Sequence, residues 1–488
     1  MKLFKSLVAT ALLATTSFVS AEFAGVNAAG GDTNYELVIS GGRVIDPETG
    51  LDAVRNVGIA GGRIQAVTTK ELVGTKILDA TGLVVSPGFI DLHAHGQNTV
   101  AQTYQVRDGV TTALELEAGN HELVQLMKDR DGSSYINFGY SAGYGGGRTI
   151  VKEGDLKRTY HEPSTPEELV QILALVEEDL DNGAMGIGLP LDYLSLGVNE
   201  AELEGLFELS ARRKVPLFIH IRMSDDASNP SGLIELIDLA RKTGAIVHMV
   251  HLVSTGLERV PLYLKMVDDA QAEGIDFTTE LYPYTAGSTG INSGIFDHDW
   301  QRKFGVSYGE IEWPPTGVRF TGKKMWDEYR AKYPEGVIII HAMNEQMVEQ
   351  GMKHPGVMIA SDGMPIETLD QRAHPRGMGT YARVLGRYVR ERHVISLPDA
   401  IGRMSYLPAK RLEAFTPAMK RKGRIQVGAD ADITIFDAEN VADRATFTEP
   451  NQYSKGITHV VVNGTVIVEN EALVEGVFPG KPISTKTP

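Results

Sequence analysis

The sequence of 488 residues contains no cysteine. Without cysteine the chain can form no disulfide, and no thiolate is present to attack a substrate or to bind a metal ion. Any site for a metal such as zinc must therefore be built from histidine and carboxylate side chains.

The sequence also lacks an excess of basic residues. Lys and Arg together number 47 against 63 Asp and Glu, which gives a formal net charge of -16. A nucleic-acid partner requires a basic face that neutralises phosphates, and no stripe of Lys and Arg is present. A small-molecule substrate is the better expectation.

No apolar run reaches the roughly 20 residues that a transmembrane helix requires. At the N-terminus, two lysines precede a short apolar run at 7–13, and Val-Ser-Ala at 19–21 has the small residues of a cleavage site. This pattern predicts a secretory signal peptide over 1–21, followed by a flexible segment at 22–33. We therefore expect a soluble exported protein, periplasmic or secreted, that has no membrane partner once the signal is removed.

Strand-like runs separated by Gly-rich and Pro-rich turns occupy residues 34–84, and similar runs recur over 411–488. Neither set is long enough to enclose a core alone. We therefore predict that the two ends of the chain combine into one small β-sandwich domain. The middle of the chain is then inserted between the two parts of this domain.

The middle, residues 85–410, alternates short apolar runs with amphipathic stretches. This alternation is typical of βα units, and it predicts an α/β fold, a (β/α)8 barrel of the TIM type. The segment 276–280 competes for a place among the strands. The predicted strands are 83–90, 111–116, 136–139, 185–188, 217–220, 246–251, 337–341 and 357–360.

Residues 289–335 interrupt this alternation with three tryptophans, three prolines and little periodicity. An unpatterned stretch of this length is usually functional or disordered. We predict an excursion over the mouth of the barrel, and two interpretations remain open. It is either a substrate lid or a surface elaboration.

The run Pro-Gly-Phe-Ile-Asp-Leu-His-Ala-His-Gly at 87–96 ends a predicted strand with His93 and His95. Residues two apart in an extended chain lie on one face, so the two imidazoles can bind one metal ion. A hydrogen-bonded pair without metal is the alternative. Two histidines do not complete a zinc site, so further ligands are expected elsewhere.

Other predicted strands also end in polar groups. His220 ends one apolar run, and His248 and His251 lie in the next, where their odd spacing places them on opposite faces. We choose His251 because it is nearer the C-terminal end. Asp362 follows a further apolar run, and either a cation offsets the cost of its burial or it caps a turn. Four histidines and an aspartate at strand ends are the parts of a hydrolytic centre for one or two divalent ions.

With these residues identified, the chain resembles the metal-dependent amidohydrolase superfamily and, within it, the N-acyl-D-amino-acid deacylase (D-aminoacylase) group. The resemblance covers nearly all of the chain after the signal. Tyr-Pro-Tyr at 282–284 and His-Pro-Arg at 374–376 are specific to the group, whereas the other motifs are shared more widely. The matching motifs lie at 87–95, 109–112, 282–288, 361–363, 374–376, 383–388 and 428–432.

The resemblance implies that His93 and His95 bind one metal position and that His220 and His251 bind the other. Zinc is the metal it implies, as one or two ions, with other divalent metals as alternatives. Asp362 would act as the acid and base.

The chain departs from the family pattern on the second barrel strand. The deacylases have a metal-binding cysteine there, whereas this chain has Glu115 and Glu117. A carboxylate can bridge two ions, and we choose Glu117 because it is nearer the strand end. Pairing of one glutamate with Arg222 is the alternative. Residues 184–193 contain no lysine, so the carboxylated lysine of other branches of the superfamily has no counterpart there.

A second departure concerns the substrate. The deacylases bind the carboxylate of the amino acid with a tyrosine and a serine that match Tyr282 and Ser288, and with a lysine whose place Val253 takes here. Either another cation replaces that lysine or the substrate is not a free α-amino acid. The candidates for substrate binding are Tyr282, Tyr284, Ser288, Arg222 and Arg376.

Together these features predict a metal-dependent hydrolase that cleaves a C-N amide bond in an N-acyl amino acid or a similar small amide. A dipeptidase or a cyclic amidase is the nearest alternative, because a fold and a metal site do not fix the substrate. A non-catalytic barrel that binds without chemistry is the alternative from another class.

Overall fold

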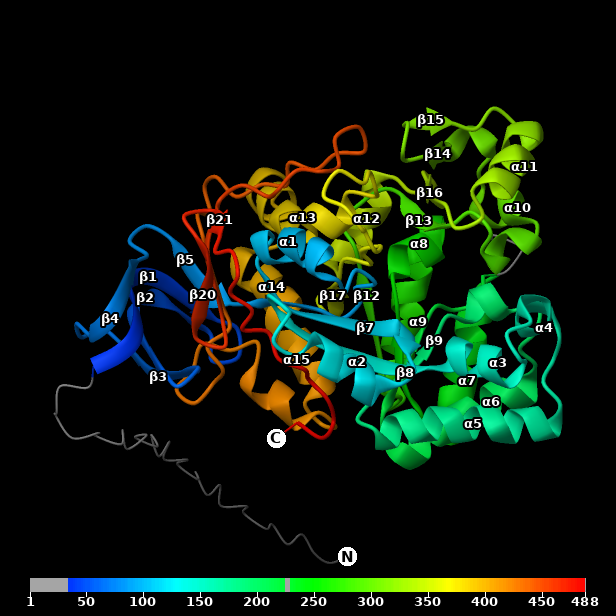
Figure 1. The fold of residues 1–488 in the computed structure, drawn as a ribbon, viewed down its shortest axis with the longest axis horizontal. Coiled ribbons are helices and arrows are strands. Elements are labelled where there is room, and N and C mark those ends of the chain that lie inside the picture. The colour runs from blue at the N-terminus through cyan, green and yellow to red at the C-terminus, as the bar shows by residue number, and fades with distance from the viewer. Residues whose placement is uncertain (1–33, 224–228, 488) are drawn as a thin grey trace, which may run out of the picture.

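The computed structural model describes residues 34–223 and 229–487. Within this part of the chain, a central barrel carries a β domain on one side and a smaller insertion, residues 287–340, on the other (Figure 1). The predicted signal peptide and the flexible segment that follows it lie outside the described residues. None of the described helices has the length and apolar character needed to cross a membrane.

The central barrel is a sheet of eight parallel strands in chain order. Its first and last strands meet through the segments that follow them, because the Asp362 N–H donates to the His93 carbonyl (2.8 Å). The sheet is therefore nearly closed, as the α/β prediction requires. Its strands are β6 (Phe89–Asp91), β7 (Val110–Asn120), β8 (Asn137–Gly143), β9 (Ile187–Leu189), β10 (Pro216–Ile219), β11 (Ile246–Met249), β12 (Phe277–Leu281) and β17 (Val357–Ile359).

One predicted barrel strand belongs to a different sheet. β16 (Val337–Ile340), predicted as 337–341, pairs antiparallel with β13 (Gly287–Gly290) and β14 (Ile311–Trp313). β12, which covers the competing segment 276–280, takes the place in the barrel between β11 and β17. β16 is a short apolar run, whereas β12 has the sequence Phe-Thr-Thr-Glu-Leu, and periodicity alone does not say which sheet such a short segment joins.

The predicted strand 83–90 is divided in two at Gly88. β5 (Val84–Pro87) pairs with strands of the β domain, whereas β6 pairs with β7 in the barrel. A Cβ atom on Gly88 would lie 2.2 Å from Thr111 Oγ1, so the chain can pass this point only without a side chain. The N-terminal passage of the chain from the β domain into the barrel thus runs through a single glycine.

The barrel helices form where the sequence supplies caps and apolar stripes. In α5 (Pro166–Asp181), Thr165 and Glu168 make a reciprocal capping box, Pro166 opens the first turn, and a buried stripe faces the barrel. The other long helices around the barrel are α1 (Thr99–Arg107), α2 (Leu123–Arg130), α3 (Tyr144–Val151), α6 (Glu200–Arg213), α7 (Ser231–Thr243), α9 (Val260–Ala272), α12 (Glu345–Lys353) and α13 (Arg376–Arg383).

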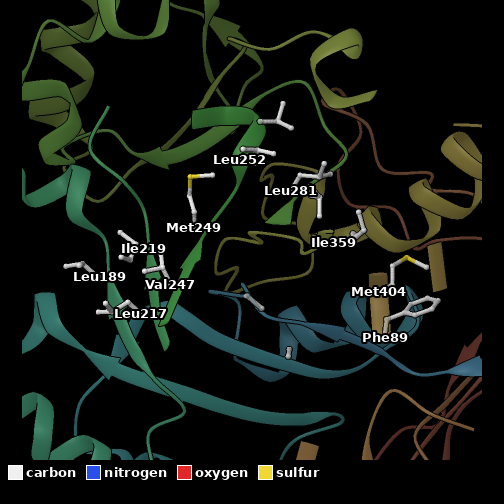
Figure 2. Packing of buried hydrophobic residues seen from close by; sticks show 14 of the residues in the cluster. Phe89, Leu189, Leu217, Ile219, Val247, Met249, Leu252, Leu281, Ile359 and Met404 are labelled. Atoms are coloured by element: carbon white, nitrogen blue, oxygen red, sulfur yellow. The ribbon is translucent and has the colours of Figure 1, made fainter. Parts of the chain in front are cut away.

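The largest apolar cluster lies between the barrel strands and these helices. Figure 2 shows Leu217, Ile219 and Val247 side by side on β10 and β11, and all three are fully buried. Burial of a side chain of this size contributes about 1.5–3 kcal/mol. The strands are therefore held rigidly, and so are the polar residues that follow them.

The β domain is one nine-stranded sheet formed by both ends of the chain, which lie side by side at the left of Figure 1. β5 from the N-terminal part pairs directly with β18 from the C-terminal part. The sheet folds over its own apolar cluster, since the Ile64 N–H donates to the Ala429 carbonyl (3.0 Å). The remaining strands are β1 (Asn34–Asp46), β2 (Leu51–Ala60), β3 (Arg63–Thr68), β4 (Val73–Asp79), β18 (Ile433–Phe436), β19 (Ile457–Val462), β20 (Thr465–Glu469) and β21 (Ala472–Leu473).

Asp432 joins the β domain to the barrel. Its Oδ2 accepts from Asn137 Nδ2 at the start of β8 (2.9 Å) and from the buried Lys422 Nζ (2.6 Å). The final described residues also contact the barrel, since the Ile483 N–H donates to the Phe138 carbonyl (2.7 Å). The C-terminal part of the β domain therefore extends along the base of the barrel.

The insertion has regular structure and its own apolar cluster, contrary to the little periodicity seen in the sequence. Trp300, Trp326 and Phe296 pack ring against ring, with centroids 5.0–5.6 Å apart. Besides β13, β14 and β16 it contains η3 (Gly294–Asp297), α10 (Trp300–Phe304), η4 (Tyr308–Glu310), β15 (Val318–Arg319) and α11 (Lys323–Lys332). Aromatic packing, which has no strict period in sequence, accounts for the order of this segment.

Candidate functional site

A cavity of about 600 Å³ opens at the C-terminal ends of the barrel strands. Its floor contains His95, Glu117, His220, His251 and Asp362, and its upper wall includes residues of the insertion. This is the end of a parallel barrel at which catalytic groups are found. The residues predicted from five separate strand ends therefore meet in one place.

His93 and His95 follow β6 and point their Nε2 atoms at each other, 3.2 Å apart. The outer nitrogen of each ring is fixed by a carboxylate. His93 Nδ1 lies 2.7 Å from Glu280 Oε1, and His95 Nδ1 lies 2.6 Å from Glu115 Oε2. These contacts orient both Nε2 atoms toward the cavity floor.

His220 and His251 form the second pair. His220 follows β10, and His251 lies two residues beyond β11 with a left-handed backbone (φ 36°). His220 Nδ1 and His251 Nε2 are 3.0 Å apart. His248 lies deeper in the barrel, where Nε2 is 3.2 Å from Glu280 Oε2. The two histidines of this segment thus do not occupy opposite faces of one strand, because β11 ends at Met249.

Glu117 lies between the two histidine pairs. Its Oε2 is 3.4 Å from both His93 Nε2 and His95 Nε2, and its Oε1 is 3.0 Å from His220 Nδ1 and 3.9 Å from His251 Nε2. One oxygen of the Glu117 carboxylate therefore lies near the first histidine pair, and the other oxygen lies near the second pair. Glu115 instead contacts the outer nitrogen of His95 and does not lie between the pairs.

Asp362 follows β17 with a left-handed backbone (φ 51°) and faces the first pair. Its Oδ1 lies 3.4 Å from both His93 Nε2 and His95 Nε2, and its Oδ2 lies 2.9 Å from Arg376 Nη1. Burial alone raises the pKa of a carboxyl group, but the Arg376 guanidinium and His93 hold the pKa of Asp362 well below its usual range.

The donor set fits a divalent metal. His93, His95 and Glu117 form one group whose ligand atoms lie within 4.8 Å of one another, and Glu117, His220 and His251 form a second. Burial lowers the pKa of His95, but the charge of Glu115 and a hydrogen bond to Asp362 raise it to about 10. The buried carboxylates thus require positive charge, and imidazole with carboxylate is a ligand set that zinc accepts.

The residues predicted to bind substrate are only partly brought together. Tyr282, Ser288 and Arg376 line the cavity, with the Arg376 guanidinium 4.6 Å from the Tyr282 ring centroid. The Ser288 hydroxyl donates to the Ile338 carbonyl (2.8 Å), so it is already engaged.

Arg222 and Tyr284 are not among the residues that line the cavity, so the structure does not support their predicted contact with substrate. The Arg222 guanidinium donates to the Ser195 and Val198 carbonyls (both 3.0 Å) and contacts Glu235, because the chain leaves the strand direction after His220. It therefore pairs with neither candidate glutamate of β7. Tyr284 is buried behind the site, with its ring 4.6 Å from the Arg383 guanidinium.

Two site residues were missed by the sequence reasoning. Glu280 connects His93 and His248, and hydrogen bonds from both offset the effect of burial and lower its pKa to about 2. Its position near the end of a candidate barrel strand was a usable signal. Tyr193 lines the cavity with its ring 4.8 Å from the His220 ring, and no sequence pattern marked it.

Known proteins match this chain in both sequence and fold. A model described as "Amidohydrolase family" matches residues 345–468. The N-acyl-D-glutamate deacylase of Alcaligenes xylosoxydans xylosoxydans is 30% identical over 474 residues, which cover 88% of this chain and 93% of that protein. The D-aminoacylase of the same organism is 28% identical over 481 residues, covering 90% of this chain and 95% of that protein.

Among solved structures, the N-acyl-D-glutamate deacylase of Bordetella bronchiseptica matches with a TM-score of 0.77 and 26% identity, covering 92% of this chain and all of that one. That structure contains zinc and a phosphonate inhibitor that mimics the tetrahedral intermediate of its reaction. These relatives match about nine tenths of the chain along nearly their whole length. The chain therefore belongs to the metal-dependent amidohydrolase superfamily, in the group of the N-acyl-D-amino-acid deacylases.

Proposed function

We propose that this metal-dependent amide hydrolase cleaves the amide bond of N-acyl-D-amino acids. The observation that carries the proposal is the position of Glu117 between two histidine pairs, with Asp362 directed at the first pair. The names of the relatives support the substrate class, because an N-acyl-D-glutamate deacylase and a D-aminoacylase match most of the chain.

The metal ligands we propose are His93 and His95 for one position and His220 and His251 for the other, with Glu117 shared. When bound, zinc supplies activation of a water molecule and polarisation of the scissile carbonyl. The chain's own residues orient these groups. Glu280 and Glu115 fix the outer nitrogens of His93 and His95, which keeps both rings in the ligating orientation.

Asp362 is the proposed acid and base. Arg376 holds Oδ2, which leaves Oδ1 directed at the centre of the site. Oδ1 accepts a proton from the attacking water and delivers it to the leaving nitrogen, since an amine leaves readily only when it is protonated. Burial of the carboxylate excludes bulk water that would otherwise compete for this proton.

The cavity favours a substrate with an apolar side chain. Among the described residues that line it, Arg376 is the only lysine or arginine, and its guanidinium is paired with Asp362. Val253 is buried against Gly351 where the relatives' group has a lysine. Leu194, Phe304 and Ile340 line the cavity as well. Among the described lining residues, Arg376 is thus the one cation available to the α-carboxylate of the substrate, and a second carboxylate would be buried without a partner, which is costly.

A panel of purified substrates tests the proposal. We expect kcat/KM for N-acyl-D-amino acids with apolar side chains to exceed that for N-acyl-D-glutamate at least about tenfold, because the cost of an unpaired buried carboxylate exceeds 1.4 kcal/mol. N-acyl-L-amino acids, dipeptides and hydantoins complete the panel. Turnover of dipeptides or hydantoins without turnover of any N-acyl-D-amino acid would contradict the proposal.

Replacing Asp362 tests the proton transfer. Asp362→Asn should lower kcat about 100- to 10,000-fold, because the amide cannot accept and return the proton. Zinc content and the thermal unfolding temperature should stay near those of the wild type. Asp370→Asn, which changes an exposed aspartate eight positions further along the chain, is the matched control and should retain full activity. Full activity of Asp362→Asn would exclude the assigned role.

Two glutamine variants on β7 distinguish the ligand from its neighbour. Glu115→Gln removes only an outer partner of His95, for which a loss of about 10- to 100-fold in zinc affinity is typical. Glu117→Gln should lose more, because an amide has one acceptor oxygen and cannot serve both histidine pairs. Zinc affinity measured by competition with a chelator separates the two. A larger loss in Glu115→Gln would reverse the assignment.

Export is also part of the proposal, and it rests on the N-terminal pattern of two lysines, an apolar run and a small-residue site. The chain produced in cells with its own N-terminus should be recovered outside the cytoplasm. Its first residue, read by N-terminal sequencing, should follow residue 21. Recovery of the uncut chain from the cytoplasm alone would rule this out.

A further inference from the structure

The four histidines of the site differ in how their outer ring nitrogen is held. Three of these nitrogens have a hydrogen-bond partner. His93 Nδ1 contacts Glu280 (2.7 Å), His95 Nδ1 contacts Glu115 (2.6 Å), and His251 Nδ1 contacts Thr255 Oγ1 (3.1 Å). The fourth, His220 Nε2, faces Asp192 Oδ2 at 3.9 Å, beyond hydrogen-bond distance.

Asp192 is placed to be the missing partner of His220. It lies in η1 (Leu191–Leu194), its side chain is 1% exposed, and its Oδ2 is buried without a hydrogen-bond partner. Its backbone N–H donates to the His220 carbonyl (3.2 Å), so the two residues are already tied together. A buried carboxylate oxygen without a partner is costly, and the nearest ring nitrogen belongs to His220.

The other oxygen of Asp192 is held by the insertion. Lys303 of α10, also 1% exposed, places Nζ 2.6 Å from Asp192 Oδ1, which in addition accepts from the Met223 N–H (3.0 Å). Two neighbours of Asp192 contact the insertion as well. Tyr193 Oη lies 3.1 Å from Thr289 Oγ1, and Ser195 Oγ lies 2.7 Å from His298 Nε2. The short η1 segment thus lies between the insertion and His220.

We propose that Lys303 and Asp192 are positioning residues that link the insertion to the metal position formed by Glu117, His220 and His251. Lys303 holds the Asp192 carboxylate so that its free oxygen can accept from the outer nitrogen of His220, as a carboxylate typically does for a metal-binding histidine. When the insertion is not docked, Asp192 loses its cation and the second metal position is weakened. This inference rests on the proposed metal centre.

Variants that each retain only one of the two metal positions test the link between the insertion and the metal centre. A His95→Asn background retains the position of Glu117, His220 and His251, whereas a His251→Asn background retains the position of His93, His95 and Glu117. Lys303→Met should weaken zinc binding about 10- to 100-fold in the first background and leave it unchanged in the second, when affinity is measured by competition with a chelator. Lys324→Met, the same change at an exposed lysine of the insertion, should alter neither.

The double variant Asp192→Asn/Lys303→Met keeps the test independent of folding. It removes both charges, so no unpaired buried charge remains. If Lys303 acts through Asp192, the double variant should bind zinc as weakly as Asp192→Asn alone, and both should unfold as single cooperative species.

Three results would overturn the link. These are equal losses in both backgrounds, additive losses in the double variant, and unchanged affinity in a folded Lys303→Met protein. Wild-type protein that binds no zinc at all would instead overturn the metal centre itself, and the inference with it. Zinc binding and amide hydrolysis are measured separately, so the two failures are distinguishable.

Discussion

The sharing of one carboxylate between two histidine pairs is the constraint on which the site depends. Glu117 cannot move toward one pair without leaving the other, because its two oxygens are engaged on opposite sides. β7 is the longest strand of the barrel and carries Glu117 past the ends of its neighbours to reach this point. The position of the second strand therefore fixes the spacing of all the proposed ligands.

The surrounding carboxylates explain how a cluster of titratable groups is tolerated in a buried region. Glu280, Glu115 and Asp192 face the outer ring nitrogens of His93, His95 and His220. Each of these three rings therefore has a carboxylate on the side away from the proposed metal position. Arg376 supplies compensating charge to Asp362 from a different element. Without such pairing, the burial of each charge would cost several kcal/mol. The polar network and the apolar shell outside the strands are thus two parts of one scaffold.

Much of the fold and the core of the site could be predicted from sequence, for identifiable reasons. His93, His95, His220 and Asp362 each follow an apolar run, and the ends of parallel strands meet, so their convergence follows from topology. The predictions that the structure contradicts or does not support concern features on which topology gives no information. Arg222 lies two residues after His220, yet the chain turns there and its guanidinium is engaged by backbone carbonyls. β16 has the same apolar character as a barrel strand, and only its partners in space distinguish it.

The joining of both chain ends in one sheet affects how the molecule is assembled. The Ser86 hydroxyl on β5 donates to the carbonyl of Thr434 on β18, which is separated from it by 348 positions. Because synthesis begins at the N-terminus, the edge formed by β5 has no neighbour until almost the entire polypeptide has been made. Contacts of such long sequence separation also form slowly. The N-terminal part of the β domain therefore cannot be completed until the C-terminal strand β18 is available to pair with β5.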